Sequence, residues 1–277
     1  MKKGRITFVP AGGLANRMMA MASAYAMTQE TGDDLNVIWF QDWALNAPFH
    51  SVFTPIPGMK LKEATLSDKL LYDRARKKNL WIPSLPQRLL FERRIQEQDV
   101  EALKSKHFDF NEWSRGHTCY MSSFNAFGTF SDTLYAQLFH PVAEVSAVID
   151  RYYAEFSSHT IGMHIRRTDH VLSIQNSPDY LFIEKAEEEI ATHSDTKIFL
   201  ATDSCEVKNL FSAKFGNRIL MQEDEASRDS INGIRGGLID MYTLSRTCKI
   251  YGSMSSMFSL IASKLGENIE LEILSKK

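Results

Sequence analysis

The second half of the chain alternates short apolar runs with longer helical patterns, and this alternation restricts the fold more than any other feature. A helical pattern over 142–156 precedes the series. The pattern predicts strands at 160–165, 198–201, 218–221 and 249–252, and helices at 178–191, 205–215, 237–245 and 256–265. Strands that alternate with helices form a parallel sheet covered by helices. The sequence therefore predicts an α/β fold.

The start of the chain shows the same alternation of strand and helix patterns. The β-branched and aromatic run Ile6–Val9 stops at Pro10-Ala11-Gly12-Gly13, a Met- and Ala-rich helix is expected over 16–31 before Gly32, and a second strand follows at 35–40. Thr118–Ser122 is a further candidate strand. We therefore expect two Rossmann-like domains, 1–155 and 156–277, that face each other across a cleft.

The region 41–115 is irregular, because five prolines interrupt it. Basic clusters lie at 74–78 and 88–94. We interpret them as solvated helix faces. The alternative is attraction of an anionic acceptor or a membrane surface, so peripheral membrane association remains open.

Composition excludes several classes of protein. The 277 residues are 44% hydrophobic and 24% charged, with a net charge of −2, which argues against a general binder of polyanions such as nucleic acid. Three widely spaced cysteines form no disulfide framework and no CxxC metal pair; we expect each to be a small buried side chain in a reducing compartment. No run of about 18 apolar residues is present, so we expect a cytoplasmic protein without a transmembrane helix.

Four segments at expected strand ends carry polar groups suited to an anion. In the first, Gly12 to Arg17, glycines allow close approach of backbone, and a helix N-terminus can receive a phosphate. The adjacent glycines do not form the GxGxxG fingerprint of dinucleotide-binding proteins. A tight turn with Asn16 as helix cap explains this segment equally well.

The segment His164-Ile165-Arg166-Arg167-Thr168-Asp169 ends an expected buried strand. Because side chains alternate along a strand, two adjacent arginines cannot both face the core. Ligands of open α/β sheets bind at the carboxyl ends of the strands, and guanidinium groups donate two hydrogen bonds to phosphate. We therefore predict an anion-binding strand end, in which Asp169 holds one arginine.

Two further strands end in polar groups at the same sheet edge. Thr202-Asp203-Ser204 follows one strand, and the hydroxyl-rich run 251–259 follows another. Helix caps explain both segments equally well. Asp240 lies on an otherwise apolar helix face, where a carboxylate accepts bonds from guanine or pairs with Arg228 or Arg235.

Together these segments resemble the fucosyltransferase superfamily, which includes the α1,6- and nodulation-type, α1,2- and protein O-fucosyltransferases. The resemblance spans both halves and is dense from 160 to 265. It implies a GT-B fold, an inverting transfer from GDP-fucose, and neither a metal nor a further cofactor. It also implies the roles of single residues: Arg166 or Arg167 on the β-phosphate, His164 and Asp240 on the guanine side, Ser255 and Ser256 on the phosphates, Asn16 near the donor sugar.

The expected site therefore has two sets of residues. The catalytic set is Arg166, Arg167, Asp169 and His170. The donor-binding set is Gly13, Asn16, Arg17, His164, Asp203, Arg228, Asp240, Ser255, Ser256 and Phe258.

The chain departs from the α1,6 branch in two places. His170 stands where that branch has lysine, and Ile174 stands where it has the glutamate implicated as base. His170, Asp179 and Asp169 are then the candidate bases. The leading hypothesis is fucose transfer to a glycan acceptor by a bacterial enzyme of surface-polysaccharide synthesis. Transfer from another nucleotide sugar and a non-catalytic nucleotide- or glycan-binding module are the alternatives.

Overall fold

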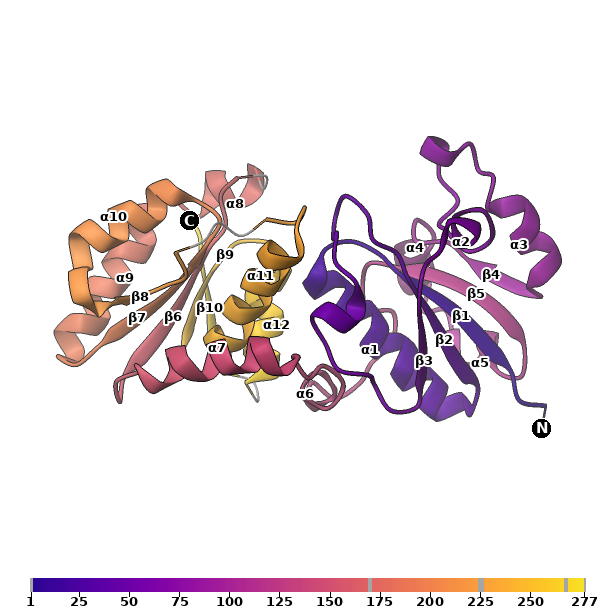
Figure 1. Ribbon diagram of the computed structural model, residues 1–277, viewed down its shortest axis with the longest axis horizontal. Helices are drawn as coiled ribbons and strands as arrows, with labels where there is room; N and C mark the ends of the chain where they lie inside the picture. Colours follow the sequence, from indigo (N-terminus) through magenta and orange to yellow (C-terminus); the bar gives the residue numbers. More distant parts are fainter. Residues whose placement is uncertain (1, 169–170, 224–226, 267–268, 277) are drawn as a thin grey trace. The chain divides into compact units, whose positions relative to one another are not determined.

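The computed structural model describes residues 2–168, 171–223, 227–266 and 269–276. The chain divides into two compact units, Met1–His140 and Pro141–Lys277, each built on a five-stranded sheet (Figure 1). Helix α7 (Ala143–Ala154) packs against α11 (Ile231–Leu244) of the second unit. The division therefore falls before α7, and not after it near residue 155.

The first unit holds a parallel sheet of order β3-β2-β1-β5-β4. Its strands are β1 (Arg5–Pro10), β2 (Asp34–Trp39), β3 (Met59–Glu63), β4 (Arg93–Ile95) and β5 (Thr118–Ser123). Its helices are α1 (Leu14–Thr31), η1 (Phe49–Ser51), α2 (Leu66–Leu71), η2 (Lys77–Asn79), α3 (Ser84–Leu90), α4 (Val100–Lys104), α5 (Phe110–Ser114) and α6 (Thr133–Leu138).

Helix α1 follows the pattern expected from its sequence. Alanine and methionine favour helix and leave little polar surface, so most of the helix is buried. Gly13 is its N-cap, and Gly32 ends it in the left-handed conformation at φ 75°. Asn16 is therefore not the cap; it lies in the first turn and donates through Nδ2 to the carbonyl of Phe124, 3.0 Å away.

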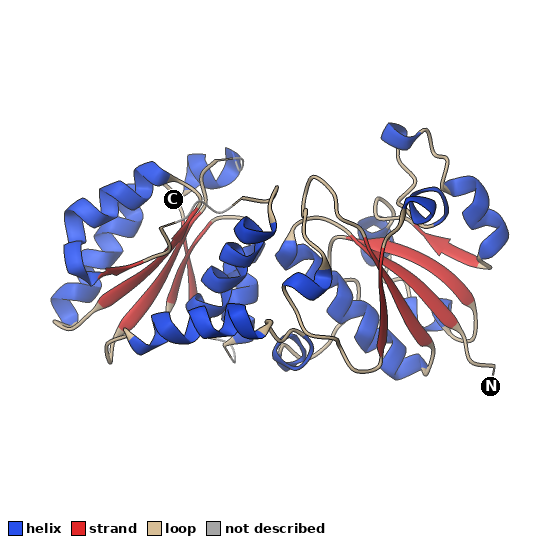
Figure 2. Cartoon of the chain, in the orientation of Figure 1, coloured by secondary structure: helices blue, strands red, loops and turns tan. Residues whose placement is uncertain are grey.

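The second unit holds a parallel sheet of order β10-β9-β6-β7-β8. Its strands are β6 (Thr160–Ile165), β7 (Lys197–Thr202), β8 (Ile219–Leu220), β9 (Ile250–Ser253) and β10 (Leu271–Leu274). Besides α7 and α11 its helices are α8 (Val171–Asn176), α9 (Asp179–Thr192), α10 (Cys205–Phe215), η3 (Gly216–Arg218) and α12 (Met257–Leu265). Helices flank the strands in both units (Figure 2).

The two faces of the second sheet pack differently. Ile161, Met163 and Ile165 of β6 join a buried apolar cluster with Phe182 of α9 and Phe211 of α10. The intervening residues of β6 point to the other face: Gly162 lies under Leu244 of α11, and His164 stacks on Phe258 of α12. The period-two pattern of a strand thus directs His164 to a different helix layer from its apolar neighbours.

Each sheet has a topological switch point. In the first, β2 and β3 extend to one side of β1 and β5 lies on the other; in the second, β7 and β8 extend to one side of β6 and β9 lies on the other. Ligands of such sheets bind where the strand order reverses, beyond the carboxyl ends of the strands. The arginine segment leaves β6 at one of these points.

Candidate functional site

A serine joins the two strands at the second switch point. Ser253, the last residue of β9, accepts a hydrogen bond from the backbone N–H of Arg166 at 3.0 Å and lies 3.2 Å from the carbonyl of His164, to which its Oγ donates. Its side chain is fully buried. Ser253 lies within the hydroxyl-rich run 251–259, although it was not among the expected site residues.

Asp203 anchors the arginine segment from the other neighbouring strand. Its Oδ1 accepts from the N–H of Arg167 at 2.8 Å, while Oδ2 pairs with Nη1 of Arg166 at 2.8 Å and accepts from Thr168 Oγ1 at 2.7 Å. The carboxylate is 5% exposed. We expected Asp203 among the donor-binding residues; in the structure its carboxylate bonds to three groups of the arginine segment.

The two arginines have different surroundings. Arg167 donates from Nε to Asp179 Oδ1 at 2.9 Å, from Nη1 to the carbonyl of Arg166 at 2.8 Å and from Nη2 to the carbonyl of Ser177 at 2.9 Å. Nη2 also pairs with Asp179. Most of the donors of Arg167 are therefore used within the protein.

His164 is a neutral aromatic group of the site. Its ring stacks on Phe258 with centroids 4.6 Å apart, and its Nδ1 lies 3.4 Å from Ser256 Oγ. Burial lowers the pKa of His164 to about 3, and the charge of Arg166 acts in the same direction. The imidazole is therefore uncharged at neutral pH, and a group of such low pKa is a poor general base.

The hydroxyl-rich loop after β9 is held in place from α8 and the turn after it. Ser173 Oγ donates to the carbonyl of Met254 at 2.7 Å, and the N–H of Met254 donates to Ser177 Oγ at 2.8 Å. Ser255 is exposed and adopts φ 60°, and Ser256 is the N-cap of α12 without a side-chain cap bond. Strained residues of this kind cluster at ligand sites. The N-terminus of α12, which attracts anions, opens beside this loop.

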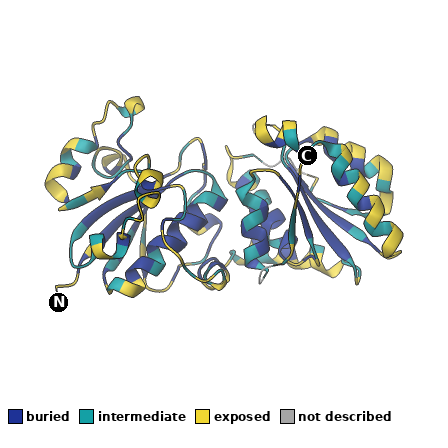
Figure 3. Cartoon of the chain, turned by 180° about the vertical axis from the view of Figure 1, so that it is seen from behind, coloured by how far each residue is buried: buried dark blue, intermediate teal, exposed yellow. Residues whose placement is uncertain are grey.

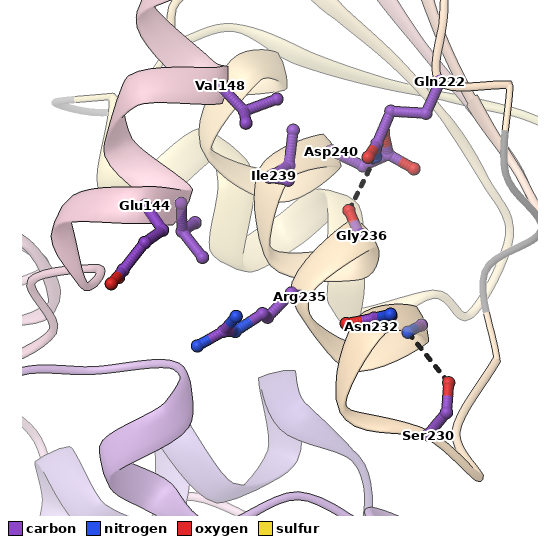
Figure 4. Close-up of a pocket in the computed structure, with 11 residues that line it drawn as sticks. Glu144, Val148, Gln222, Ser230, Asn232, Arg235, Gly236, Ile239 and Asp240 are labelled. Atoms are coloured by element: carbon purple, nitrogen blue, oxygen red, sulfur yellow. Dashed lines mark hydrogen bonds between the residues drawn. The ribbon is translucent and has the colours of Figure 1, made fainter.

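A pocket of about 580 Å³ lies between α7, α11 and the segment after β8 (Figure 4). It is lined by Glu144, Val145, Val148, Gln222, Ser230, Asn232, Gly233, Arg235, Gly236, Ile239 and Asp240.

Gln222 Nε2 donates to Asp240 Oδ1 at 2.5 Å and to the carbonyl of Gly236 at 2.7 Å. Burial raises the pKa of Asp240 to about 7, although the bond from Gln222 and the charge of Lys208 oppose this rise. Gln222 is a further site residue that the sequence did not single out.

The glycine loop of the first unit is built around a buried arginine. Arg17 donates to the carbonyls of Gly12 and Phe40, at 2.8 and 2.5 Å, and pairs with Asp42 at 3.0 Å. Its side chain is 0% exposed, and its guanidinium lies 4.6 Å from the ring centroid of Trp39. Arg17, expected among the donor-binding residues, therefore holds the loop, and its Nε, Nη1 and Nη2 each have a partner within the protein. Gly13 and Asn16 stay at the mouth of the first switch point, partly exposed.

The remaining expected residues are distributed as follows. Asp169 and His170 lie outside the described residues. Arg228 is exposed in the segment that leads to α11. Asp179, a candidate base, is paired with Arg167, and Ile174 is exposed on α8. Cys119 is buried as expected, whereas Cys205 and Cys248 are exposed.

Among the described residues, one group has the composition of a metal site: His159, Glu189 and His193. It lies at the amino ends of β6 and β7, opposite the edge with the arginine segment. Both oxygens of Glu189 already have partners, His159 Nε2 at 2.7 Å and the hydroxyl of Tyr251. The group therefore satisfies itself and is not part of the candidate site.

Comparison with solved structures places the fold among fucosyltransferases. The chain is similar to the α-1,6-fucosyltransferase NodZ soaked with GDP-fucose, with 21% identity, a TM-score of 0.68 and coverage of 95% of this chain and 93% of the other. NodZ from Bradyrhizobium was also found, at 20% identity and a TM-score of 0.65, over 95% and 93% of the two chains.

More distant likenesses extend over equally long stretches. FUT1 of Arabidopsis thaliana in complex with GDP matches with 15% identity and a TM-score of 0.64, over 98% of this chain and 70% of the other. POFUT1 in complex with GDP-fucose matches with 10% identity and a TM-score of 0.56, over 99% and 98%. No family profile and no curated protein sequence matches the chain. The resemblance read from the motifs is thus confirmed at the level of the fold, and the chain has the GT-B fold of the fucosyltransferases.

Proposed function

We propose that the protein transfers fucose from GDP-fucose to a hydroxyl group of a glycan acceptor, with inversion at the sugar carbon and without a metal ion. The observation that carries this proposal is the switch point between β6 and β9, where Arg166, Ser256 and the N-terminus of α12 converge on one sheet edge. The likeness to fucosyltransferases solved with GDP or GDP-fucose supports the choice of donor.

The diphosphate would bind at this edge. Arg166 is fixed on one side by Asp203 and would donate to the β-phosphate, while Ser255, Ser256 and the first turn of α12 receive the remaining oxygens. As the bond between fucose and phosphate breaks, negative charge develops on the leaving GDP. A fixed guanidinium and a helix N-terminus stabilise that charge without reorganising, which is the role that a metal ion has in other transferases.

The guanine base would reach Asp240 in the pocket of Figure 4. An ionised Asp240 accepts hydrogen bonds from the N1–H and the amino group of guanine, which adenine and uracil cannot supply in the same pattern. Neutral His164, stacked on Phe258, closes the guanosine side of the site. The volume of about 580 Å³ lies within the range of pockets that bind small molecules.

The acceptor hydroxyl must lose its proton to a base as its oxygen attacks the sugar carbon. Asp169, His170 and Asp179 remain the candidates, and Asp179 would first have to release Arg167. Dispersed cysteines favour a reducing compartment, so we place the reaction in the cytoplasm, in the synthesis of a surface polysaccharide.

Titration calorimetry with GDP, UDP and ADP tests the donor site. GDP should bind, and Arg166→Ala should weaken it about 10- to 100-fold, the loss expected for a charge-assisted bond to phosphate. Arg246→Ala is the matched control, because Arg246 pairs with Asp150 on the exposed surface of the same unit. Equal binding of all three nucleotides, or equal losses in the two variants, would refute the proposed donor site.

Turnover tests the chemistry. Release of GDP from GDP-fucose with a panel of glycan acceptors is expected, and its absence together with tight GDP binding would indicate a non-catalytic nucleotide-binding module instead. Asp169→Asn, His170→Gln and Asp179→Asn should then be compared at saturating donor. Loss of the base lowers kcat and leaves KM for GDP-fucose nearly unchanged.

A further inference from the structure

Helices α2 and α3 of the first unit each bury a polar side chain and expose leucines. In α3, Gln87 is fully buried and donates to the carbonyl of Asp73 at 2.9 Å, whereas Leu89 is 91% exposed and Leu85 lies one turn before it, also exposed. Helices of globular proteins normally turn their apolar side to the core. Here the polar side chain anchors the helix, and the leucines face outward.

Helix α2 repeats this arrangement. Its buried residue is Asp68, which pairs with Lys62 at 2.8 Å and caps its own helix through Thr65. Leu66 is 81% exposed, and Leu70 follows one turn later on the same side. Since α2 contacts α3, the four outward leucines belong to one region of the molecule.

The turn between these helices exposes three more apolar side chains, Leu80, Trp81 and Ile82. Leu80 and Trp81 have φ of 53° and 60°, a conformation unfavourable for side chains of this size. Asn79 holds the turn by accepting from the N–H of Arg76 at 2.9 Å and donating to the carbonyl of Arg74 at 2.8 Å. These two bonds hold the backbone of the turn that carries Trp81.

The charges of this region have one sign. From residue 66 to residue 91 the exposed charged side chains are Lys69, Lys77, Lys78 and Arg88, all basic, in a chain whose net charge is −2. The two acidic residues of the stretch, Asp68 and Asp73, are withdrawn into ion pairs with basic partners. Figure 3 shows these helices and the turn largely in the colour of exposed residues.

We propose that residues 66–90, the α2–α3 surface, dock on a membrane whose lipids carry negative charge. Leucine and tryptophan side chains insert at the boundary of headgroups and acyl chains, and flanking lysines bind anionic headgroups. A protein partner fits less well, because lysine is depleted in protein interfaces and this surface exposes Lys69, Lys77 and Lys78. The proposal concerns a surface remote in sequence from the arginine segment and does not depend on the donor.

Vesicle sedimentation tests the docking. The full chain should bind vesicles containing about a third phosphatidylglycerol and bind pure phosphatidylcholine at least tenfold more weakly. Lys77→Gln with Lys78→Gln should reduce partitioning about 30-fold, since each basic residue near such a surface contributes about 1 kcal/mol. Leu85→Ser with Leu89→Ser should reduce it at least tenfold. Leu210→Ser, an exposed leucine of α10, is the matched control and should change nothing.

Circular dichroism reports whether the first unit of each variant, which carries the substitutions, is folded. The binding of GDP reports that the other unit is intact. The proposal is overturned if the native chain does not bind anionic vesicles. It is also overturned if the leucine variants bind them as well as the native chain, or if these variants convert a dimer to a monomer without affecting vesicle binding. The last result would identify the surface as an interface between two copies of the chain.

Discussion

Replacing Asp203 by asparagine tests whether this carboxylate organises the arginine segment. The substitution preserves the shape of the side chain and one acceptor oxygen, and it removes the charge that faces Arg166. In the native protein three groups bond this carboxylate, each at 2.7 or 2.8 Å. Asparagine cannot satisfy all three, because its amide nitrogen donates and does not accept.

The size of the effect follows from burial. Breaking a buried ion pair by removing one partner costs about 3–5 kcal/mol, and a hydrogen bond to a charged group contributes about 1.5–3 kcal/mol. Arg166 retains some exposure, at 19%, so water compensates part of the loss. We expect Asp203→Asn to lower the free energy of unfolding of the second unit by about 2–3 kcal/mol and to weaken GDP binding about tenfold, because Arg166 loses its anchor.

Urea unfolding followed by circular dichroism measures the first quantity, and calorimetry measures the second. Asp150→Asn is the matched control: Asp150 pairs with Arg246 at 2.6 Å in the same unit, but its side chain is 64% exposed. An exposed pair contributes about 0–1 kcal/mol. Equal losses of stability in the two variants, or unchanged GDP affinity in Asp203→Asn, would show that Asp203 does not position the arginines.

Three further predictions address the other parts of the site. GDP affinity should rise about tenfold between pH 6 and pH 8. Burial raises the pKa of Asp240 to about 7, and Asp240 must ionise to accept hydrogen bonds from guanine. In calorimetry, Asp240→Asn should bind GDP weakly and without this pH dependence. The free energy of unfolding of the second unit should fall as pH falls from 6.5 toward 3, because His164 takes up a proton in the unfolded chain and stays neutral when buried. His164→Phe should weaken this pH dependence in urea unfolding. An unchanged dependence of the unfolding free energy on pH would contradict the prediction. Arg17→Met should destabilise the first unit by about 3 kcal/mol in thermal or urea unfolding, because it leaves Asp42 without this partner. GDP affinity should stay within about twofold. A large loss of affinity would show that Arg17 contributes to donor binding.

The regular part of the fold was predictable from the sequence. Strand β6 begins and ends where its apolar run does, and the helices that follow it have strong periodic patterns. Three strands were missed, namely β3, β4 and β10. They are the edge or outer strands of their sheets, short and partly polar, so their sequences carry little alternation.

The sequence predicted which strand ends lie together at the candidate site, but not the contacts of the single side chains there. The rule that ligands bind at carboxyl ends of strands selected the segments of Arg166 and Asp203 correctly as neighbours. It could not separate Arg166 from Arg167, because the difference depends on Asp179 and on two backbone carbonyls. The burial of Arg17 likewise depends on Asp42, a residue from the irregular region that had no readable pattern.

The left-handed conformation of Ser255, at φ 60°, lowers the stability of the loop after β9. A left-handed conformation costs a serine about 1 kcal/mol and costs glycine almost nothing, so Ser255→Gly would make the second unit more stable. Natural chains settle near a threshold of stability and not at its maximum, so a residue less stable than glycine is tolerated at this position. Glycine lacks the hydroxymethyl side chain, whose hydroxyl is the one polar group that Ser255 adds to the backbone here. The loop after β9 is thus a place where stability and ligand binding can be measured against each other in one substitution.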